Sequence, residues 1–346
     1  MLISKPNTHG GDVYSKNISL DFSANTNPFG MPKEVLDAIV KSAKKSAYYP
    51  DAYCTDLRKK TAFFEGVGEN QLLFGNGATE LLYSFALSLS RTKKALIVAP
   101  AFCEYANALS SAEVEFDYYI TKKENGFILT EDFLKLDFSP YSAVFLCSPS
   151  NPVGALIDEI IIRRVLETGV RVLLDLSFVD LTENPKMYNI AELINSFDNL
   201  TVLRAFTKSF ALAGIRLGYV ISSDSILLEK MSEKTQCWNV SVPAQGAGIA
   251  ALDCYEWLKN TVKTIQKEKK RLKKALCDMG ITVFDGEANF LLLYSEKDLY
   301  KELLNKKILV RDCSDYVGLG KGYIRIAVRT EDENSFLLSA ISEALK

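Results

Sequence analysis

The chain has 346 residues, of which 48% are hydrophobic and 24% charged, a balance typical of globular proteins and a length greater than one ordinary hydrophobic core holds. The formal net charge is −2 with no long run of one sign, so neither nucleic acid nor a membrane surface is an expected partner. Seven scattered cysteines without C-x-x-C spacing argue against a disulfide framework and a structural zinc site, and we expect no metal. The first residues are too few and too polar for a signal peptide, and no apolar run is long enough to span a bilayer, so a cytoplasmic protein is expected.

Up to residue 225, short apolar runs alternate with longer stretches of helical periodicity. Strands are predicted at 95–99, 143–147, 170–174, 201–203 and 217–221, and helices at 34–46, 78–89 and 157–168. This alternation is typical of a mainly parallel sheet with crossover helices.

After residue 225 the pattern changes. It predicts a long helix from about 245 to 279, strands at 289–294, 308–311 and 323–328, and a final helix from about 333. We therefore expect a large domain over 31–225 and a small α+β domain over 226–346, which the N-terminal arm, 1–30, joins.

Lys208 lies in the segment that is most informative about chemistry. Thr207 and Lys208 follow an apolar strand-like run, and Arg216 stands before the next one. Upstream, Asp175 ends another apolar run. An amine that can form an imine, a carboxylate for a pyridine nitrogen, and a cation and hydroxyl for a phosphate are what pyridoxal phosphate requires. Because ligand-contacting residues gather at the carboxyl ends of parallel strands, these groups are expected to meet.

Each of these residues also has an ordinary structural interpretation. Asp175 alone suits a helix cap, and Lys208 alone suits the surface. However, the phenylalanines at 206 and 210 indicate an apolar setting, which would lower the pKa of the amine.

Further candidates lie in turns. Residues 75–80, which include Gly77 and Ala78, open a predicted helix and would expose backbone N–H groups to an anion, although Gly-Asn-Gly is also an ordinary turn. The third glycine of a dinucleotide fingerprint is missing, which argues against a nicotinamide dehydrogenase. Asn151, between two prolines, suits either a rigid turn or a bond to a phenolic oxygen, and Phe102 suits either a core or a cofactor ring.

Three cationic residues are candidates for binding an anionic substrate. His9 is the only histidine and precedes two glycines, which would allow the backbone to approach a ligand closely, although it could equally be an idle tail residue. Arg311 and Arg325 lie on late strands, where they suit either structural ion pairs or a carboxylate and a phosphate.

Taken together, these residues resemble fold-type I pyridoxal-phosphate enzymes of the aspartate aminotransferase superfamily. Within it, the most similar branch joins histidinol-phosphate aminotransferases to threonine-phosphate decarboxylases of cobalamin biosynthesis. Besides the Asn151 loop, Asp175 and the Lys208 run, the likeness is carried by segments 9–12, 20–30, 49–51, 75–80, 100–105, 311–319 and 324–329.

The resemblance implies an α/β fold, with a mainly parallel, seven-stranded-type sheet in the large domain and a smaller α+β domain, and a homodimer with shared active sites. Lys208 would bond pyridoxal 5'-phosphate and shuttle protons, Asp175 would pair with its ring nitrogen, and Asn151 would pair with its phenolic oxygen. The other implied roles are ring stacking by Phe102, cofactor-phosphate binding by Gly77, Ala78, Thr207, Arg216 and a second subunit's Tyr53, and substrate binding by His9, Gly10, Asn27, Arg311 and Arg325.

The two enzyme types differ at informative positions. The His-Gly-Gly start, the Arg-x-Cys-x-x-Tyr-x-Gly-Leu segment and Phe178, where related aminotransferases usually carry a tyrosine, are similar to the decarboxylases. Leu176-Ser177 departs from the usual Glu-Ala of both, although contact of this pair with the ring nitrogen is not expected. We expect decarboxylation of L-threonine O-3-phosphate to 1-aminopropan-2-yl phosphate, with an aminotransferase acting on histidinol phosphate or a related amino acid as the alternative. A non-catalytic member of the fold would be expected to lose the lysine or the aspartate, and both are present.

Overall fold

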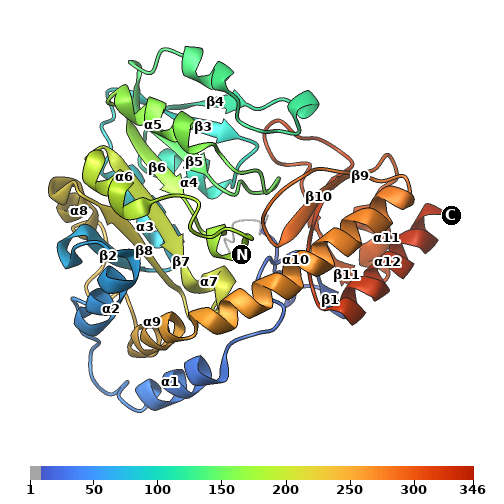
Figure 1. Cartoon of the computed structure of the whole chain (residues 1–346), viewed down its shortest axis with the longest axis horizontal. Helices are drawn as coiled ribbons and strands as arrows, with labels where there is room; N and C mark the ends of the chain where they lie inside the picture. The colour runs from blue at the N-terminus through green and yellow to red at the C-terminus, as the bar shows by residue number, and fades with distance from the viewer. Residues whose placement is uncertain (1–8) are drawn as a thin grey trace, which may run out of the picture.

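A computed structural model describes residues 9–346 and has a large seven-stranded sheet beside a smaller α+β unit (Figure 1). The strand order is β2-β8-β7-β6-β5-β3-β4; β8 is antiparallel to both neighbours, and all other adjacent pairs are parallel. The strands span Leu72–Asn76 (β2), Lys94–Ala99 (β3), Phe116–Ile120 (β4), Tyr141–Cys147 (β5), Arg171–Asp175 (β6), Leu200–Ala205 (β7) and Leu217–Ser222 (β8). The predicted α/β class with a mainly parallel sheet is confirmed.

Helices cover both faces of this sheet because successive strand side chains point to opposite sides. On one face, Leu173 and Leu203 pack in a core with α3 (Ala78–Leu87), α4 (Glu104–Ser111) and α8 (Ser225–Ser232). On the other, Val172 and Val202 pack in a core with α5 (Glu159–Glu167), α6 (Ile190–Ser196) and α9 (Val242–Asp253). Short 3₁₀ helices η1 (Glu69–Gln71), η2 (Lys123–Asn125), η3 (Glu131–Lys135) and η4 (Val179–Leu181) lie in the connections.

The smaller unit is built on an antiparallel sheet with the order β12-β13-β10-β9. These strands span Thr282–Val283 (β9), Phe290–Tyr294 (β10), Arg311–Asp312 (β12) and Tyr323–Ala327 (β13), and the helices span Tyr255–Asp278 (α10), Leu299–Asn305 (α11) and Glu331–Leu345 (α12). The N-terminal arm joins this unit, since β1 (Leu20–Asp21) pairs in parallel with β11 (Ile308–Leu309), and Phe22 lies in the unit's core.

The packing places residues beyond 225 against the large sheet. Helix α8 contacts α3, and α9 contacts α1 (Lys33–Ala43) and α2 (Thr55–Glu65). Within α10, Leu258 and Val262 belong to the core of the large sheet, whereas Leu272 belongs to that of the small unit. We therefore propose that the domain boundary lies within α10 rather than at the expected residue 225, because α8 and α9 still cover the large sheet after its last strand.

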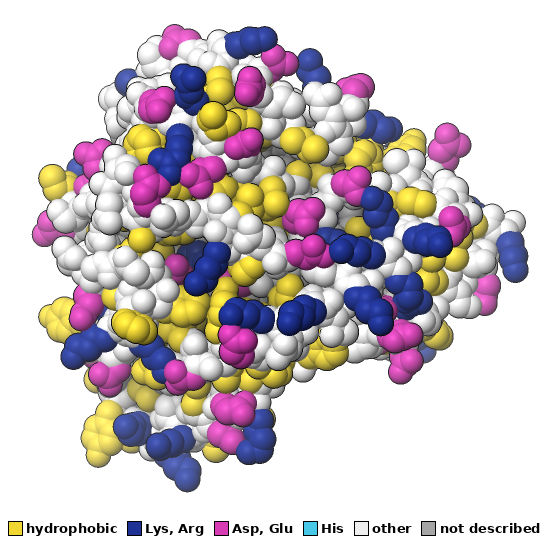
Figure 2. All heavy atoms as spheres, viewed as in Figure 1, with side chains coloured by type: hydrophobic (Ala, Val, Ile, Leu, Met, Phe, Trp, Pro, Cys, Tyr) yellow, Lys and Arg dark blue, Asp and Glu magenta, His cyan; other side chains and the backbone are white. Residues whose placement is uncertain are grey.

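Two predicted elements are corrected. The expected helix over 245–279 is two helices that meet at Cys254, and the expected strand over 308–311 is two short strands, β11 and β12, in different sheets. Along α10, lysines 263, 267, 270 and 274 are exposed, and lysines and acidic side chains are interspersed on this face of the molecule (Figure 2). Lys269 is buried, and its Nζ donates to the carbonyls of Gly286 and Ala288. Among the described residues, no helix is both long and apolar enough to cross a membrane.

Candidate active site

A cavity of about 230 Å³ lies at the carboxyl ends of β5, β6 and β7, between the large sheet, the N-terminal arm and the smaller unit. It brings together many of the residues expected from the sequence. Those that line it are His9, Gly10, Ala78, Phe102, Asn151, Asp175, Thr207, Lys208, Arg216, Arg311 and Arg325.

Asp175 is the last residue of β6 and is 7% exposed. The Tyr105 hydroxyl donates a 2.7 Å hydrogen bond to Oδ2, and the backbone N–H of Ser177 donates one of 2.9 Å to Oδ1. Burial raises the pKa of Asp175, while the Ser177 and Tyr105 hydrogen bonds act in the opposite direction. A carboxylate fixed in a dry cavity in this way is suited to pairing with a protonated nitrogen.

Lys208 lies in α7 (Phe206–Ser209), the single helical turn that follows β7. Its backbone carbonyl accepts a 2.9 Å hydrogen bond from the Asn27 N–H, which ties this turn to the N-terminal arm. Burial, together with the nearby charges of Arg325 and Arg216, lowers the pKa of Lys208 to about 8. The predicted lowering of this pKa is confirmed, and the amine is correspondingly available as a nucleophile.

The N-terminus of α3 and Arg216 form a cradle suited to an anion. Ala78 and Thr79 line the cavity in the first turn of α3, where backbone N–H groups have no intrahelical partner. Gly77 precedes them with φ of 81°, and a Cβ there would lie 2.6 Å from Nη2 of Arg216. Thr207 adds a buried hydroxyl at the same cavity.

Arg325 and Asn151, which both line the cavity, are joined by a hydrogen bond. Arg325 donates to Oδ1 of Asn151 through Nη1 and to the Ser23 carbonyl through Nη2 at 2.7 Å, and the Tyr316 hydroxyl donates to the same Oδ1 at 3.3 Å. Two donors on Oδ1 leave the amide N–H groups of Asn151 for another acceptor. Within residues 9–346, Arg325 forms no ion pair, although it is 6% exposed, so its charge is suited to an anionic ligand.

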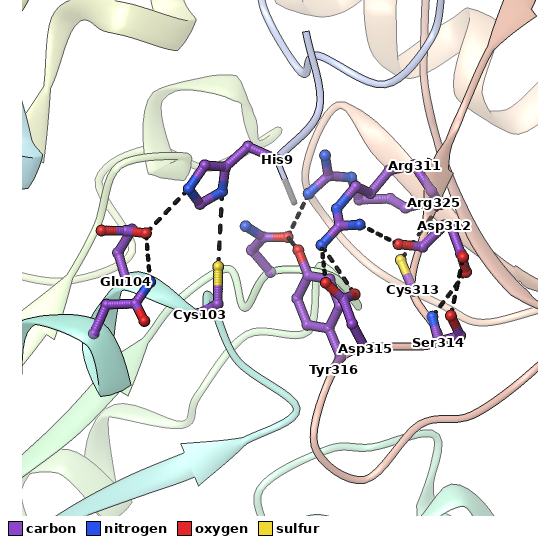
Figure 3. Close-up of polar contacts among 12 residues, drawn as sticks. His9, Cys103, Glu104, Arg311, Asp312, Cys313, Ser314, Asp315, Tyr316 and Arg325 are labelled. Carbon is purple, nitrogen blue, oxygen red and sulfur yellow. Dashed lines mark hydrogen bonds and ion pairs between the residues drawn. The ribbon is translucent and has the colours of Figure 1, made fainter. Parts of the chain in front are cut away.

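His9 and Arg311 line the cavity, but their polar groups already contact protein side chains (Figure 3). His9 Nε2 lies 3.0 Å from Oε1 of Glu104, and Nδ1 lies 3.7 Å from Sγ of Cys103. Arg311 Nη2 donates to both carboxylate oxygens of Asp315, at 3.0 and 2.9 Å. Binding of a substrate anion by either residue therefore requires these contacts to be shared or exchanged.

The glycines after His9 hold the arm against the backbone of Ser23. A Cβ on Gly10 would lie 2.3 Å from the Ser23 carbonyl oxygen, and the Gly11 N–H donates to Ser23 Oγ at 2.7 Å. The arm can take this close path only without a side chain at position 10, whereas Gly11 is favoured by its φ of 83°.

Two expected residues lie away from the cavity. Asn27 is 2% exposed, and its Nδ2 donates to the Ser209 carbonyl and to Thr261 Oγ1, each at 3.0 Å, so in this structure the amide positions α7. Its expected contact with the substrate stays a prediction. Tyr53 is 76% exposed and does not line this chain's cavity. Its expected contact with a second subunit's cofactor stays a prediction.

Several lining residues were not singled out as site residues. Tyr105 holds Asp175, and Asn25, oriented with Oδ1 toward the guanidinium, accepts from Arg325 Nε at 3.2 Å. Phe178 packs against Phe290 with ring centroids 5.1 Å apart and faces the amine of Lys208. Tyr105 follows Phe102 by three residues, and their rings pack edge to face. This spacing is the local signal in the sequence that could have placed Tyr105 at the site.

The family model described as "Aminotransferase class I and II" matches residues 17–341. The chain is 33% identical to the threonine-phosphate decarboxylase of Salmonella typhimurium, covering 97% of this chain and 96% of that one. Two similar solved structures are the histidinol-phosphate aminotransferase from Clostridium acetobutylicum (28% identity, TM-score 0.88) and the L-threonine-O-3-phosphate decarboxylase from Porphyromonas gingivalis (26%, 0.85); each alignment covers 94% of this chain and 99% of the other. The chain therefore belongs to the class I and II aminotransferase family.

Proposed function

We propose that this protein is a pyridoxal 5'-phosphate enzyme that decarboxylates L-threonine O-3-phosphate to 1-aminopropan-2-yl phosphate in cobalamin biosynthesis. The observation that carries the proposal is one cavity that combines the Lys208 amine and a buried carboxylate with three residues that can carry positive charge. Arg325 contacts Asn151 and the Ser23 carbonyl, its register partner Arg311 contacts Asp315, and His9 contacts Glu104. A small substrate that carries both a carboxylate and a phosphate requires more than one such partner.

The residues of the cavity fit pyridoxal phosphate. The cradle of Gly77, Ala78, Thr207 and Arg216 suits its phosphate, and the buried carboxylate of Asp175 suits its ring nitrogen. The free amide N–H groups of Asn151 suit its phenolic oxygen, and the Phe102 ring suits stacking. When bound, the cofactor supplies an electron sink for negative charge that develops on the substrate Cα.

In this proposal each protein group has a specific task. Lys208 would hold the cofactor and would hold or deliver a proton at the substrate Cα, for which a pKa of about 8 is well matched. Asp175 keeps the ring nitrogen protonated, while Tyr105 and Ser177 hold the carboxylate in place. Arg325 would bind the substrate carboxylate and thereby orient the bonds at the substrate Cα.

Transamination of histidinol phosphate or a related amino acid by 2-oxoglutarate is the alternative. The similarity to the Clostridium acetobutylicum structure supports it, since that fold accommodates an aminotransferase. Phe178 favours decarboxylation, because its ring offers no hydroxyl at the position where related aminotransferases usually carry a tyrosine.

We also propose that the working unit is a homodimer with shared active sites. Aromatic side chains are exposed around the N-terminal helices, where Tyr49 stacks on Trp238 with ring centroids 4.1 Å apart. The strongly exposed ones are Tyr48 (78%), Tyr49 (77%), Tyr53 (76%) and Phe63 (91%). Burial of such rings against a second copy would remove a large apolar area from water.

The deciding experiment is to incubate the purified protein separately with L-threonine O-3-phosphate alone and with histidinol phosphate plus 2-oxoglutarate. Decarboxylation regenerates the cofactor, so multiple turnovers to carbon dioxide and 1-aminopropan-2-yl phosphate are expected without any oxo acid. Glutamate formation from the second mixture, with no carbon dioxide from the first, would assign the aminotransferase instead.

A further inference from the structure

Three side chains with different donor atoms meet at the edge of the cavity (Figure 3). His9 comes from the N-terminal arm, and Cys103 and Glu104 come from the start of α4. One donor atom of each lies within 4.8 Å of the other two, and the His9 imidazole stands between the thiol and the carboxylate at 3.7 and 3.0 Å. Nitrogen, sulfur and oxygen donors from two distant segments are thus gathered at one point.

These separations suit a tetrahedral ion. Zinc bonds of about 2.0–2.3 Å at tetrahedral angles place neighbouring donor atoms roughly 3.3–3.7 Å apart. One ion takes only one nitrogen of His9, and with one donor atom per residue the three donors lie within 4.8 Å of one another. Side-chain rotations that bring the donors about 1 Å closer would therefore complete the geometry. Imidazole and thiolate favour zinc and similar transition metals, whereas magnesium and calcium prefer oxygen ligands alone.

The carboxylate of this cluster is held by outer partners. Glu104 accepts from the Tyr83 hydroxyl through Oε2 at 2.8 Å and from Asn107 Nδ2 through Oε1 at 2.7 Å, and its side chain is 12% exposed. Metal-bound carboxylates are typically oriented by hydrogen bonds of this kind. The His9 ring also packs near Phe102, with centroids 5.5 Å apart, which limits its orientation.

We propose that His9, Cys103 and Glu104 bind one divalent zinc-type ion, with the fourth position left to water or an anion. A thiolate and a carboxylate would balance the charge of the ion, and the neutral imidazole would complete the set. In the metal-bound form the ion, rather than a protonated His9, would then offer the site for an anion at this edge of the cavity. The bound ion would fasten the N-terminal arm to α4 and so fix the wall of the cavity that His9 forms. The sequence does not predict this site, because its ligands come from residues 9 and 103–104 and show no C-x-x-C spacing.

The test is direct metal binding by the chelator-treated holoenzyme, which does not depend on the identity of the substrate. Zn²⁺ is titrated in competition with a chromogenic chelator, and Co²⁺ is added in parallel to record its visible spectrum. One equivalent of Zn²⁺ per chain is expected, and the cobalt form should show tetrahedral d–d bands with thiolate-to-metal charge transfer.

Cys103→Ser and Glu104→Gln should each weaken Zn²⁺ binding by roughly 100-fold or more, since loss even of an outer partner costs about 10–100-fold. Cys277→Ser changes an exposed thiol on a different helix, α10, and is the matched control; it should bind Zn²⁺ as the unaltered protein does. Equal affinity in the Cys103 and Cys277 variants would overturn the proposal. So would a cobalt spectrum of the unaltered protein without thiolate charge transfer, a result that requires no variant to fold.

Discussion

The two ends of the cavity are built in different ways. The groups assigned to the cofactor lie at strand ends of one mainly parallel sheet, where Asp175 is buried and Lys208 half-buried. The groups assigned to the substrate phosphate come from the arm and from β12, and they already contact Glu104, Cys103 and Asp315. The chemistry is thus fixed by the sheet, whereas the selection of substrate relies on side chains that must exchange partners.

The largest effect is expected at the cofactor end. Asp175→Asn should retain the bound cofactor but lower turnover by about 10²–10³-fold or more, because a neutral amide no longer keeps the ring nitrogen protonated. Steady-state rates with cofactor content measured by absorbance check this. Tyr105→Phe, which removes one donor to Asp175, is the control and should cost much less. Near-normal turnover in Asp175→Asn would remove this residue from the mechanism.

The phosphate end should respond to charge in both directions. Arg311→Ala should weaken the binding of L-threonine O-3-phosphate by about 1.5–3 kcal/mol and leave the binding of unphosphorylated L-threonine almost unchanged. Asp315→Asn should have the opposite effect and tighten the binding of the phosphorylated substrate, because it releases the Arg311 guanidinium from its ion pair. Inhibition constants for both compounds provide the measurement. Equal loss for the two compounds in Arg311→Ala would show that the arginine is structural.

The pH dependence tests the environment of Lys208. Burial and the neighbouring arginines lower the pKa of this amine to about 8. The neutral fraction of the amine therefore falls about tenfold for each pH unit below 8, and above pH 8 most of the amine is neutral. The rate at which pyridoxal phosphate bonds to the cofactor-free protein should therefore rise with pH and level off above about 8. Stopped-flow absorbance follows this rate. A rise that continues to pH 10 would mean that the amine has its ordinary pKa.

A smaller effect tests the shared site. Mixing Tyr53→Ala subunits with Lys208→Ala subunits should give heterodimers with one doubly altered and one intact site, so roughly a quarter of the unaltered activity should return. Tyr14→Ala in place of Tyr53→Ala is a control for an exposed tyrosine outside the aromatic group. No recovery despite measured subunit exchange would contradict the shared site.

Much of the cofactor end was predictable because it depends on local order. Asp175, Thr207 and Lys208 end apolar strands, and a parallel sheet brings such ends to one edge. The contacts of Asn27 were not predictable, since its partners, Ser209 and Thr261, lie far along the chain. The pairing of His9 with Glu104 depends on how the arm crosses α4, and the proposed domain boundary within α10 depends on the packing of α9 against the large sheet. These are long-range contacts without a local pattern.

The claim that the cavity is a pyridoxal-phosphate site centred on Lys208 is tested most directly by borohydride reduction of the purified protein, followed by peptide mapping. The account predicts a single pyridoxyl group per chain, carried by the peptide that contains Lys208, and its loss in Lys208→Ala. A pyridoxyl group on another lysine, or a protein that binds no cofactor when it is supplied, would contradict the account.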